Sequence, residues 1–310
     1  MKIAVLGAGA MGGLYGSYLS RENEVTMVDI NETVVNKINS EGFEVREPDG
    51  SSNIFHPNAV TSTAGMAPVD VIIIFLNSRF TETALEGNKA IIGPNTCLMT
   101  MQNGSGHENL LGKFVPQENI ILGTTQHNAN VAGPGITNHG GSGMTYIGCV
   151  TGSADRFKPV ADTFNACGLE AKVSDEVQKM IWNKMFTNVS ASALTAITQM
   201  PLGYISFNEQ AWELCQKLVR EAVDVAKALG MDFDYEEKIA DVKAVCDNAP
   251  KGLTSIYSDI KNGRRTEVDT ISGSVVAAGK KVGVPTPTHD MVVTLMHALE
   301  GRVLYDLDKE

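Results

Sequence analysis

The stretch Lys2-Ile-Ala-Val-Leu-Gly7-Ala-Gly9-Ala-Met-Gly12-Gly13 decides the fold of this 310-residue chain. An apolar run leads directly into glycines spaced G-x-G-x-x-G, and a helical pattern follows at once. Gly7 permits a tight turn, Gly9 lets the backbone approach a pyrophosphate, and Gly12 lets the helix pack close to the strand. The N-terminus of that helix presents N–H groups and a positive dipole end to phosphates. The alternative is a glycine-rich turn that binds nothing. We predict a dinucleotide site at Gly7, Ala8, Gly9, Ala10, Met11 and Gly12.

Strand-like and helix-like segments alternate over the first 125 residues. Strands are expected at 2–6, 24–28, 69–75, 96–101 and 119–125, and helices at 11–22, 31–41, 80–91 and 106–114. This alternation predicts a parallel, doubly wound sheet. Short antiparallel strands and a helix near 154–167 are expected to complete this domain. From Asp175 the pattern is helical. The fold class is therefore α/β, with a Rossmann domain over 1–173 and an all-helical domain over 174–310.

Composition limits the function classes. The formal net charge is −11 and no basic tract occurs, which argues against nucleic acid and against anionic membrane surfaces. Five well-separated cysteines indicate neither a disulfide framework nor a zinc site, so we expect reduced thiols in a cytoplasmic protein. The histidines lack metal-ligand spacing, and no metal is predicted. No signal peptide and no membrane span are expected.

Asp29 bears on the choice of cofactor. It follows the second expected strand, 22 residues after Gly7, where an acid can bind both ribose hydroxyls of NAD and repel the 2′-phosphate of NADP. The alternative is a solvated turn residue beside a helix cap at Asn31. The nearest basic residue after the strand is Lys37. The sequence therefore favours NADH over NADPH.

Polar residues within apolar helical patterns form a second constellation. Lys184, Asn188 and Ser192 are spaced four apart, which places them on one face of a regular helix. A lysine among apolar neighbours also suits a snorkelling side chain whose charge reaches water. Thr266 is expected to be an N-cap with Glu267 in the first helical turn, where an acid also complements the helix dipole. Asn103 follows a parallel strand at the edge where ligands bind in such sheets, although a simple turn is the alternative.

These motifs together resemble the ketopantoate reductases (2-dehydropantoate 2-reductases). The resemblance covers the whole chain and rests on Gly7-Ala-Gly9-Ala-Met-Gly12, Gln102-Asn103-Gly104, Lys184-x-x-x-Asn188, Ser255 and Arg265-Thr266-Glu267-Val-Asp269. It implies a Rossmann domain and a helical domain that enclose the active site. The implied reaction reduces a 2-keto acid to the (R)-2-hydroxy acid with a nicotinamide cofactor, usually NADPH.

The resemblance also implies roles for individual residues. Lys184 would be the general acid, and Glu267 would hold the substrate hydroxyl or orient the lysine. Asn103 would lie between the nicotinamide and the lysine. The substrate-binding residues would be Asn188, Ser192 and Ser255. The expected partner is a small 2-keto acid, and a homodimer through the helical domain is a further expectation.

Three departures from the family pattern lie at the implied site. Ser192 stands where members commonly carry a second asparagine, Leu76–Arg79 lacks a lysine common there, and Asp29 replaces a basic residue. The leading hypothesis is reduction of ketopantoate to (R)-pantoate. Its main rival is an NAD-dependent D-2-hydroxyacid dehydrogenase for branched or aromatic 2-keto acids. A β-hydroxyacid dehydrogenase and a non-enzymatic nucleotide sensor are more distant alternatives.

Overall fold

The computed structural model describes residues 1–302 of the chain. The chain forms two compact units, and each is described by itself. The first contains Met1–Gln102 and His107–Gln178. The second contains the chain from Lys179 onward together with the short loop Asn103–Gly106, which the sequence places within the first half.

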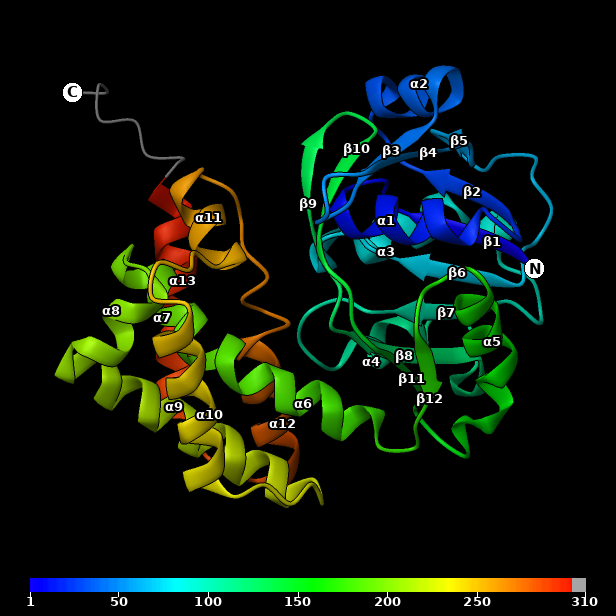
Figure 1. Ribbon diagram of the computed structural model, residues 1–310. Coiled ribbons are helices and arrows are strands. Elements are labelled where there is room, and N and C mark those ends of the chain that lie inside the picture. Colours follow the sequence, from blue (N-terminus) through cyan, green and yellow to red (C-terminus); the bar gives the residue numbers. More distant parts are fainter. Residues whose placement is uncertain (303–310) are drawn as a thin grey trace, which may run out of the picture. The chain divides into compact units, whose positions relative to one another are not determined.

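An eight-stranded sheet forms the centre of the first unit, in the order β12-β11-β8-β7-β6-β1-β2-β5 (Figure 1). Its strands are β1 (Lys2–Leu6), β2 (Glu24–Val28), β5 (Asn58–Val60), β6 (Val71–Ile74), β7 (Cys97–Thr100), β8 (Ile120–Thr125), β11 (Thr145–Cys149) and β12 (Ala171–Val173). The six strands from β5 to β8 run parallel, and β11 lies antiparallel to β8. The carboxyl ends of the parallel strands therefore share one edge, where open sheets of this kind bind ligands.

A second sheet of four strands has the order β4-β3-β10-β9. It comprises β3 (Phe43–Arg46), β4 (Ser52–Phe55), β9 (Asn128–Gly133) and β10 (Ile136–Gly141). The short strands expected to be antiparallel are so only in part, because β10 pairs parallel with β3 and β12 pairs parallel with β11. The expectation is confirmed where β10 lies antiparallel to β9 and β11 antiparallel to β8, whereas the two parallel pairings join strands that are separated by long connections.

Helix α1 (Ala10–Leu19) packs against both sheets. Its buried Leu14, Tyr15 and Leu19 join a core cluster with Ile3 and Val5 of β1. Gly13 permits close packing on the smaller sheet, because a Cβ atom there would lie 1.9 Å from the ring of Phe43. The other helices of this unit are α2 (Glu32–Glu41), α3 (Thr81–Gly87), α4 (His107–Leu111) and α5 (Lys158–Ala166).

The second unit is helical (Figure 1). It contains α6 (Val177–Thr187, whose first residues belong to the first unit), a π-helical segment (Asn188–Ser192), α7 (Ala193–Thr198), α8 (Leu202–Phe207), α9 (Glu209–Ala228), α10 (Tyr235–Asn248), α11 (Ser255–Lys261), α12 (Ser272–Val282) and α13 (Pro287–Gly301). The long helix α9 is strongly amphipathic, and its buried Leu218 and Val219 lie in one apolar cluster with Val189, Val275 and Met296. The structure thus confirms the predicted fold class.

No helix within residues 1–302 combines the length and the apolar character that a membrane crossing needs. All five cysteines are free thiols.

Candidate active site

The glycine loop between β1 and α1 has the geometry that a dinucleotide needs. Gly7 has a φ of +93°, and its N–H donates to the carbonyl oxygen of Val28 on β2. A Cβ atom on Gly12 would lie 1.8 Å from the carbonyl oxygen of Gly7, so only glycine lets α1 approach the loop this closely. Gly9 differs, because it is exposed and a Cβ atom there would meet nothing within 4 Å. The open side of Gly9 is where a pyrophosphate would approach.

The start of α1 suits an anion. Gly9 is the N-cap, no side chain caps the helix, and the first turn carries no acidic residue. Ala10 and Met11, which open the helix, are half-buried. A helix N-terminus of this kind presents backbone N–H groups and a positive dipole end to phosphate. The residues present therefore fit a bound dinucleotide.

Asp29 is tied to the glycine loop. One carboxylate oxygen accepts the N–H of Ala8 at 2.9 Å, and the other accepts the N–H of Asn31 at 2.9 Å. The cap of α2 is Asn31, whose side chain accepts the N–H of Thr33. Asp29 is thus not the helix cap, and its half-buried carboxylate lies beside the loop that would hold the pyrophosphate. Lys37, the nearest basic residue after β2 along the chain, pairs with Glu41.

Lys184 lies near the end of α6, in an apolar stretch. Trp182, Met185 and Phe186 around it are buried in the core of the second unit, whereas the lysine itself is exposed. Desolvation by the surrounding protein lowers the pKa of Lys184 below that of an ordinary lysine. Because the side chain also meets water, screening limits the size of this effect.

A π-helical segment, Asn188–Ser192, follows α6 directly. Its wider turns carry more residues than those of an α-helix, so Ser192 does not repeat the angular position of Lys184 as it would in a regular helix. Asn188 is half-buried and Ser192 is buried. π-Helical turns inside α-helices occur frequently at functional sites, which makes this junction a site candidate.

Two threonines connect Ser192 with Ser255. The hydroxyl of Thr195 donates to the carbonyl oxygen of Ser192 at 2.7 Å and lies 2.8 Å from the hydroxyl of Thr254. Thr254 caps α11, where its side chain accepts the N–H of Tyr257. Ser255 is the first residue of α11 and is exposed. These hydrogen bonds connect the segment that carries Ser192 to the start of α11, where Ser255 lies.

The Asn103–Gly106 loop lies against the segment that carries Glu267. The N–H of Ser105 donates to the carbonyl oxygen of Thr270 at 3.1 Å, and the N–H of Thr270 donates to that of Glu267 at 3.1 Å. Gly104 has a φ of +95°, and a Cβ atom there would lie 1.8 Å from the carbonyl oxygen of Thr270. Asn103 and Glu267 are both half-buried. The second unit therefore brings the Asn103 loop and the Glu267 segment together.

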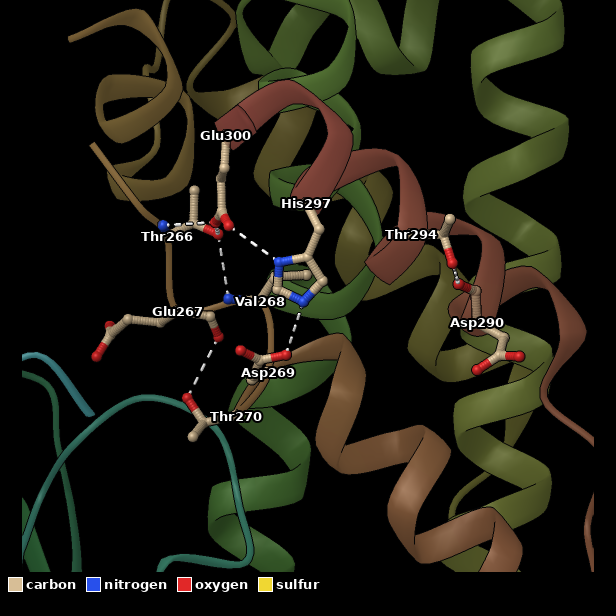
Figure 2. A network of polar contacts seen from close by, with 9 residues as sticks. All are labelled: Thr266, Glu267, Val268, Asp269, Thr270, Asp290, Thr294, His297 and Glu300. Carbon is tan, nitrogen blue, oxygen red and sulfur yellow. Dashed lines mark hydrogen bonds and ion pairs between the residues drawn. The ribbon is translucent and has the colours of Figure 1, made fainter. Parts of the chain in front are cut away.

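The expectation that Thr266 caps a helix was wrong. Helix α12 begins at Ser272 with Ile271 as its N-cap, and Glu267 lies in a turn before it. The reason is visible in Figure 2: the N–H and hydroxyl of Thr266 both donate to Glu300, while its hydroxyl oxygen accepts the N–H of Val268. Glu300 and His297, which bonds to it, were not predicted from the sequence, because no short motif links them to Thr266.

Metal ligands are not gathered anywhere in the described residues 1–302, where no group of three or more His, Cys, Asp or Glu side chains could hold an ion.

Comparison with known proteins assigns the chain to a family. Residues 3–152 match the family described as "Ketopantoate reductase PanE/ApbA", and residues 176–300 match its C-terminal counterpart. The chain belongs to the ketopantoate reductase family. It is accordingly a nicotinamide-dependent oxidoreductase that acts on a CH–OH group, and the substrates of this family are small keto acids.

Curated relatives and solved structures extend over the full length. The 2-dehydropantoate 2-reductase of Streptococcus pyogenes is 30% identical over 97% of this chain and 98% of its own. That of Halobacterium salinarum is 28% identical over 98% of both chains. D-mandelate dehydrogenase, solved with NADH and anilino(oxo)acetate, has a TM-score of 0.89 and 32% identity over 99% of this chain and 100% of its own. A ketopantoate reductase from Ralstonia eutropha has a TM-score of 0.88 and 25% identity over 98% of this chain and 100% of its own.

Proposed function

We propose that this protein is a 2-dehydropantoate 2-reductase, which reduces ketopantoate to (R)-pantoate with Lys184 as the general acid. A bound NADH or NADPH supplies the hydride that reduces the keto carbon. As the carbonyl becomes an alkoxide, the Lys184 ammonium donates a proton to its oxygen and becomes a neutral amine. Before that transfer the positive charge of Lys184 stabilises the charge developing on the oxygen.

The observation that carries the proposal is the position of Lys184 and Asn188 at the junction of α6 with the π-helical segment. Desolvation lowers the pKa of Lys184, which makes the ammonium a better acid than an ordinary lysine. A general acid works best when its pKa lies near the working pH, so this direction suits proton donation.

The other residues would bind and orient. Asn188, Ser192 and Ser255 supply amide and hydroxyl groups for the polar atoms of the substrate. Glu267 would accept a hydrogen bond from the substrate hydroxyl or from Lys184, and either contact would orient the transferred proton. Asn103 would contribute an amide beside the nicotinamide, supported by the contact between its loop and Thr270.

NADH is the favoured cofactor. The Asp29 carboxylate accepts the N–H of Ala8, so it lies beside the glycine loop with lone pairs left for ribose hydroxyls. A 2′-phosphate there would meet a like charge, and Lys37, the nearest basic residue after β2 along the chain, is already paired with Glu41. The similar D-mandelate dehydrogenase was solved with NADH, which supports the same choice.

A second candidate function is an NAD-dependent D-2-hydroxyacid dehydrogenase for branched or aromatic 2-keto acids. Ser192 favours it, because a buried serine leaves more room and fewer hydrogen bonds than the asparagine common in the family. The 32% identity to D-mandelate dehydrogenase, solved with an aromatic oxo acid, favours it as well.

A panel of keto acids tests both candidates. kcat/KM is measured for ketopantoate, 2-ketoisovalerate and phenylglyoxylate, each with NADH and with NADPH. The proposal expects ketopantoate to have the highest kcat/KM and NADH to exceed NADPH. Negligible turnover of ketopantoate beside rapid turnover of another keto acid would establish the second candidate instead.

Two expectations concern the protein in its setting. Free thiols suit a reducing compartment, and we infer a cytoplasmic enzyme. A homodimer is also expected, and light scattering at several protein concentrations measures it.

A further inference from the structure

A network of polar side chains joins α13 to the segment that carries Glu267 (Figure 2). One oxygen of Glu300 accepts both the N–H of Thr266 at 2.7 Å and its hydroxyl at 2.6 Å. The other oxygen lies 2.9 Å from Nδ1 of His297, and Nε2 of that ring lies 3.0 Å from a carboxylate oxygen of Asp269. Two residues of α13 thus bind the segment on both sides of Glu267.

The geometry points to a specific role: Glu300 and His297 are positioning residues that fix the Thr266–Thr270 turn, and with it the Glu267 carboxylate. This inference rests on the proposed function, in which Glu267 orients the substrate or Lys184. Neither positioning residue needs to touch a ligand, because both act through the backbone and hydroxyl of Thr266 and through Asp269.

Burial makes the Glu300 bonds strong. Its side chain is only 6% exposed, so its carboxylate has exchanged water for the donors of Thr266 and His297. Burial by itself would raise the pKa of Glu300, but the hydrogen bonds from Thr266 and His297 overcome this and lower the pKa. Hydrogen bonds to an ionised group are stronger than those between neutral groups.

His297 completes the network by bridging two acids. The hydrogen bond to Glu300 and the contacts with Asp269 raise the pKa of His297, although partial burial opposes this. The protonated ring donates to both carboxylates at once, whereas a neutral ring has only one N–H to give. Deprotonation therefore releases one of the two acids, and the turn is held most firmly at pH values below the pKa of His297.

Hydrogen bonds within the Thr266–Thr270 turn couple the position of Thr266 to that of Glu267. The N–H and hydroxyl of Thr270 both donate to the carbonyl oxygen of Glu267, at 3.1 and 3.2 Å, and the carbonyl of Thr270 accepts the N–H of Ser105. Displacing Thr266 therefore shifts Glu267 and weakens the contact between Thr270 and the Asn103 loop. A misplacement of about 1 Å at a catalytic group costs about a hundredfold in rate.

Three variants and one control test the inference. Glu300→Ala removes the acceptor of Thr266, whereas Glu300→Gln keeps one acceptor oxygen and removes the charge. His297→Ala removes the ring that joins Glu300 to Asp269 and leaves the bonds from Thr266 to Glu300 in place. The control, Thr294→Ala, alters the same helix at an exposed hydroxyl that bonds to the carbonyl oxygen of Asp290.

Steady-state kinetics and amide hydrogen exchange are then measured on each variant, and the titration of His297 on each variant that retains this residue. Glu300→Ala should lower kcat by about 10- to 100-fold with a smaller change in the KM for NADH, because a catalytic group is misplaced and not removed. The amides of Thr266 and Val268 should exchange faster in this variant, and Glu300→Gln should restore most of both readouts. The pKa of His297, followed by NMR, should fall in Glu300→Gln.

The inference is overturned if Glu300→Ala exchanges these amides as slowly as the wild type, or if its kcat equals that of Thr294→Ala. If the wild type reduces no keto acid, the proposed function fails by itself. Hydrogen exchange and the His297 titration then decide on their own whether α13 fixes the turn.

Discussion

Substitution of Gly104 by alanine is a sharp test of the contact between the Asn103 loop and the Glu267 segment. The added Cβ atom would lie 1.8 Å from the carbonyl oxygen of Thr270, whereas real Cβ atoms essentially never come closer than 3.0 Å. The neighbour is backbone, so no side chain can rotate away, and the loop must move by about 1 Å. That movement breaks the hydrogen bond between Ser105 and Thr270.

The expected cost follows from these contacts. A non-glycine residue at a φ of +95° costs about 1–2 kcal/mol, and the broken hydrogen bond adds about 1 kcal/mol. A shift of about 1 Å at Asn103 and Glu267 should lower kcat about a hundredfold. Steady-state kinetics measures the rate, and urea denaturation measures the free energy of unfolding.

Gly283→Ala is the matched control. Gly283 also has a positive φ, +76°, but a Cβ atom there would meet nothing within 4 Å. The Gly283→Ala variant should lose about 1 kcal/mol in free energy of unfolding, because alanine disfavours a positive φ, and it should keep the wild-type kcat. If Gly104→Ala turned over within a factor of two of Gly283→Ala, the reasoning that the loop positions the active site would be refuted.

Three further predictions concern the cofactor site and the core. Asp29→Ser should relax the preference for NADH, seen as a smaller ratio of the two kcat/KM values, and an unchanged ratio would exclude Asp29 from cofactor choice. Gly12→Ala should weaken NADH binding strongly and lower stability, because its Cβ atom would lie 1.8 Å from the carbonyl oxygen of Gly7; an unchanged Kd for NADH would contradict this. Burial lowers the pKa of His289 from 6.5 to about 4 in the folded protein. The unfolded chain therefore takes up this proton at a higher pH than the folded one, and the free energy of unfolding falls as the pH drops below 6.5. Between pH 7.5 and 5 this group should cost about 2 kcal/mol, and His289→Gln should remove that loss in urea denaturation.

The sequence predicts the parts of the fold whose signals are local. The apolar run before Gly7 is typical of a strand that is buried on both faces, and the glycine spacing is typical of the tight turn into α1. Together they indicate the parallel sheet. The strands β3, β4, β5 and β9 were not predicted. Of these, β4 (Ser52–Phe55) and β9 (Asn128–Gly133) are mostly exposed and contain no continuous run of large apolar side chains. These strands exist through pairing with β3 and β10, partners that no local pattern identifies.

The site is predictable to a similar extent. The spacing of Lys184 and Asn188 is visible in the sequence, but the π-helical turn that begins at Asn188 is not, because packing around a helix decides such turns. Glu300 bonds to Thr266 although the two are 34 residues apart, and the sequence around Glu300 looks like an ordinary amphipathic helix. Long-range hydrogen bonds of this kind leave no spacing that could be recognised in advance.

The dependence of kcat/KM for keto-acid reduction on pH, in the wild type and in Lys184→Ala, tests the central claim most directly. A general acid must be protonated, and the pKa of Lys184 is lowered, so the wild-type rate should fall with rising pH at a pKa below 10.5. Lys184→Ala should lose about 10²–10⁴ in kcat together with this alkaline limb. A variant that keeps the wild-type rate, or the same alkaline limb, would show that another group protonates the carbonyl.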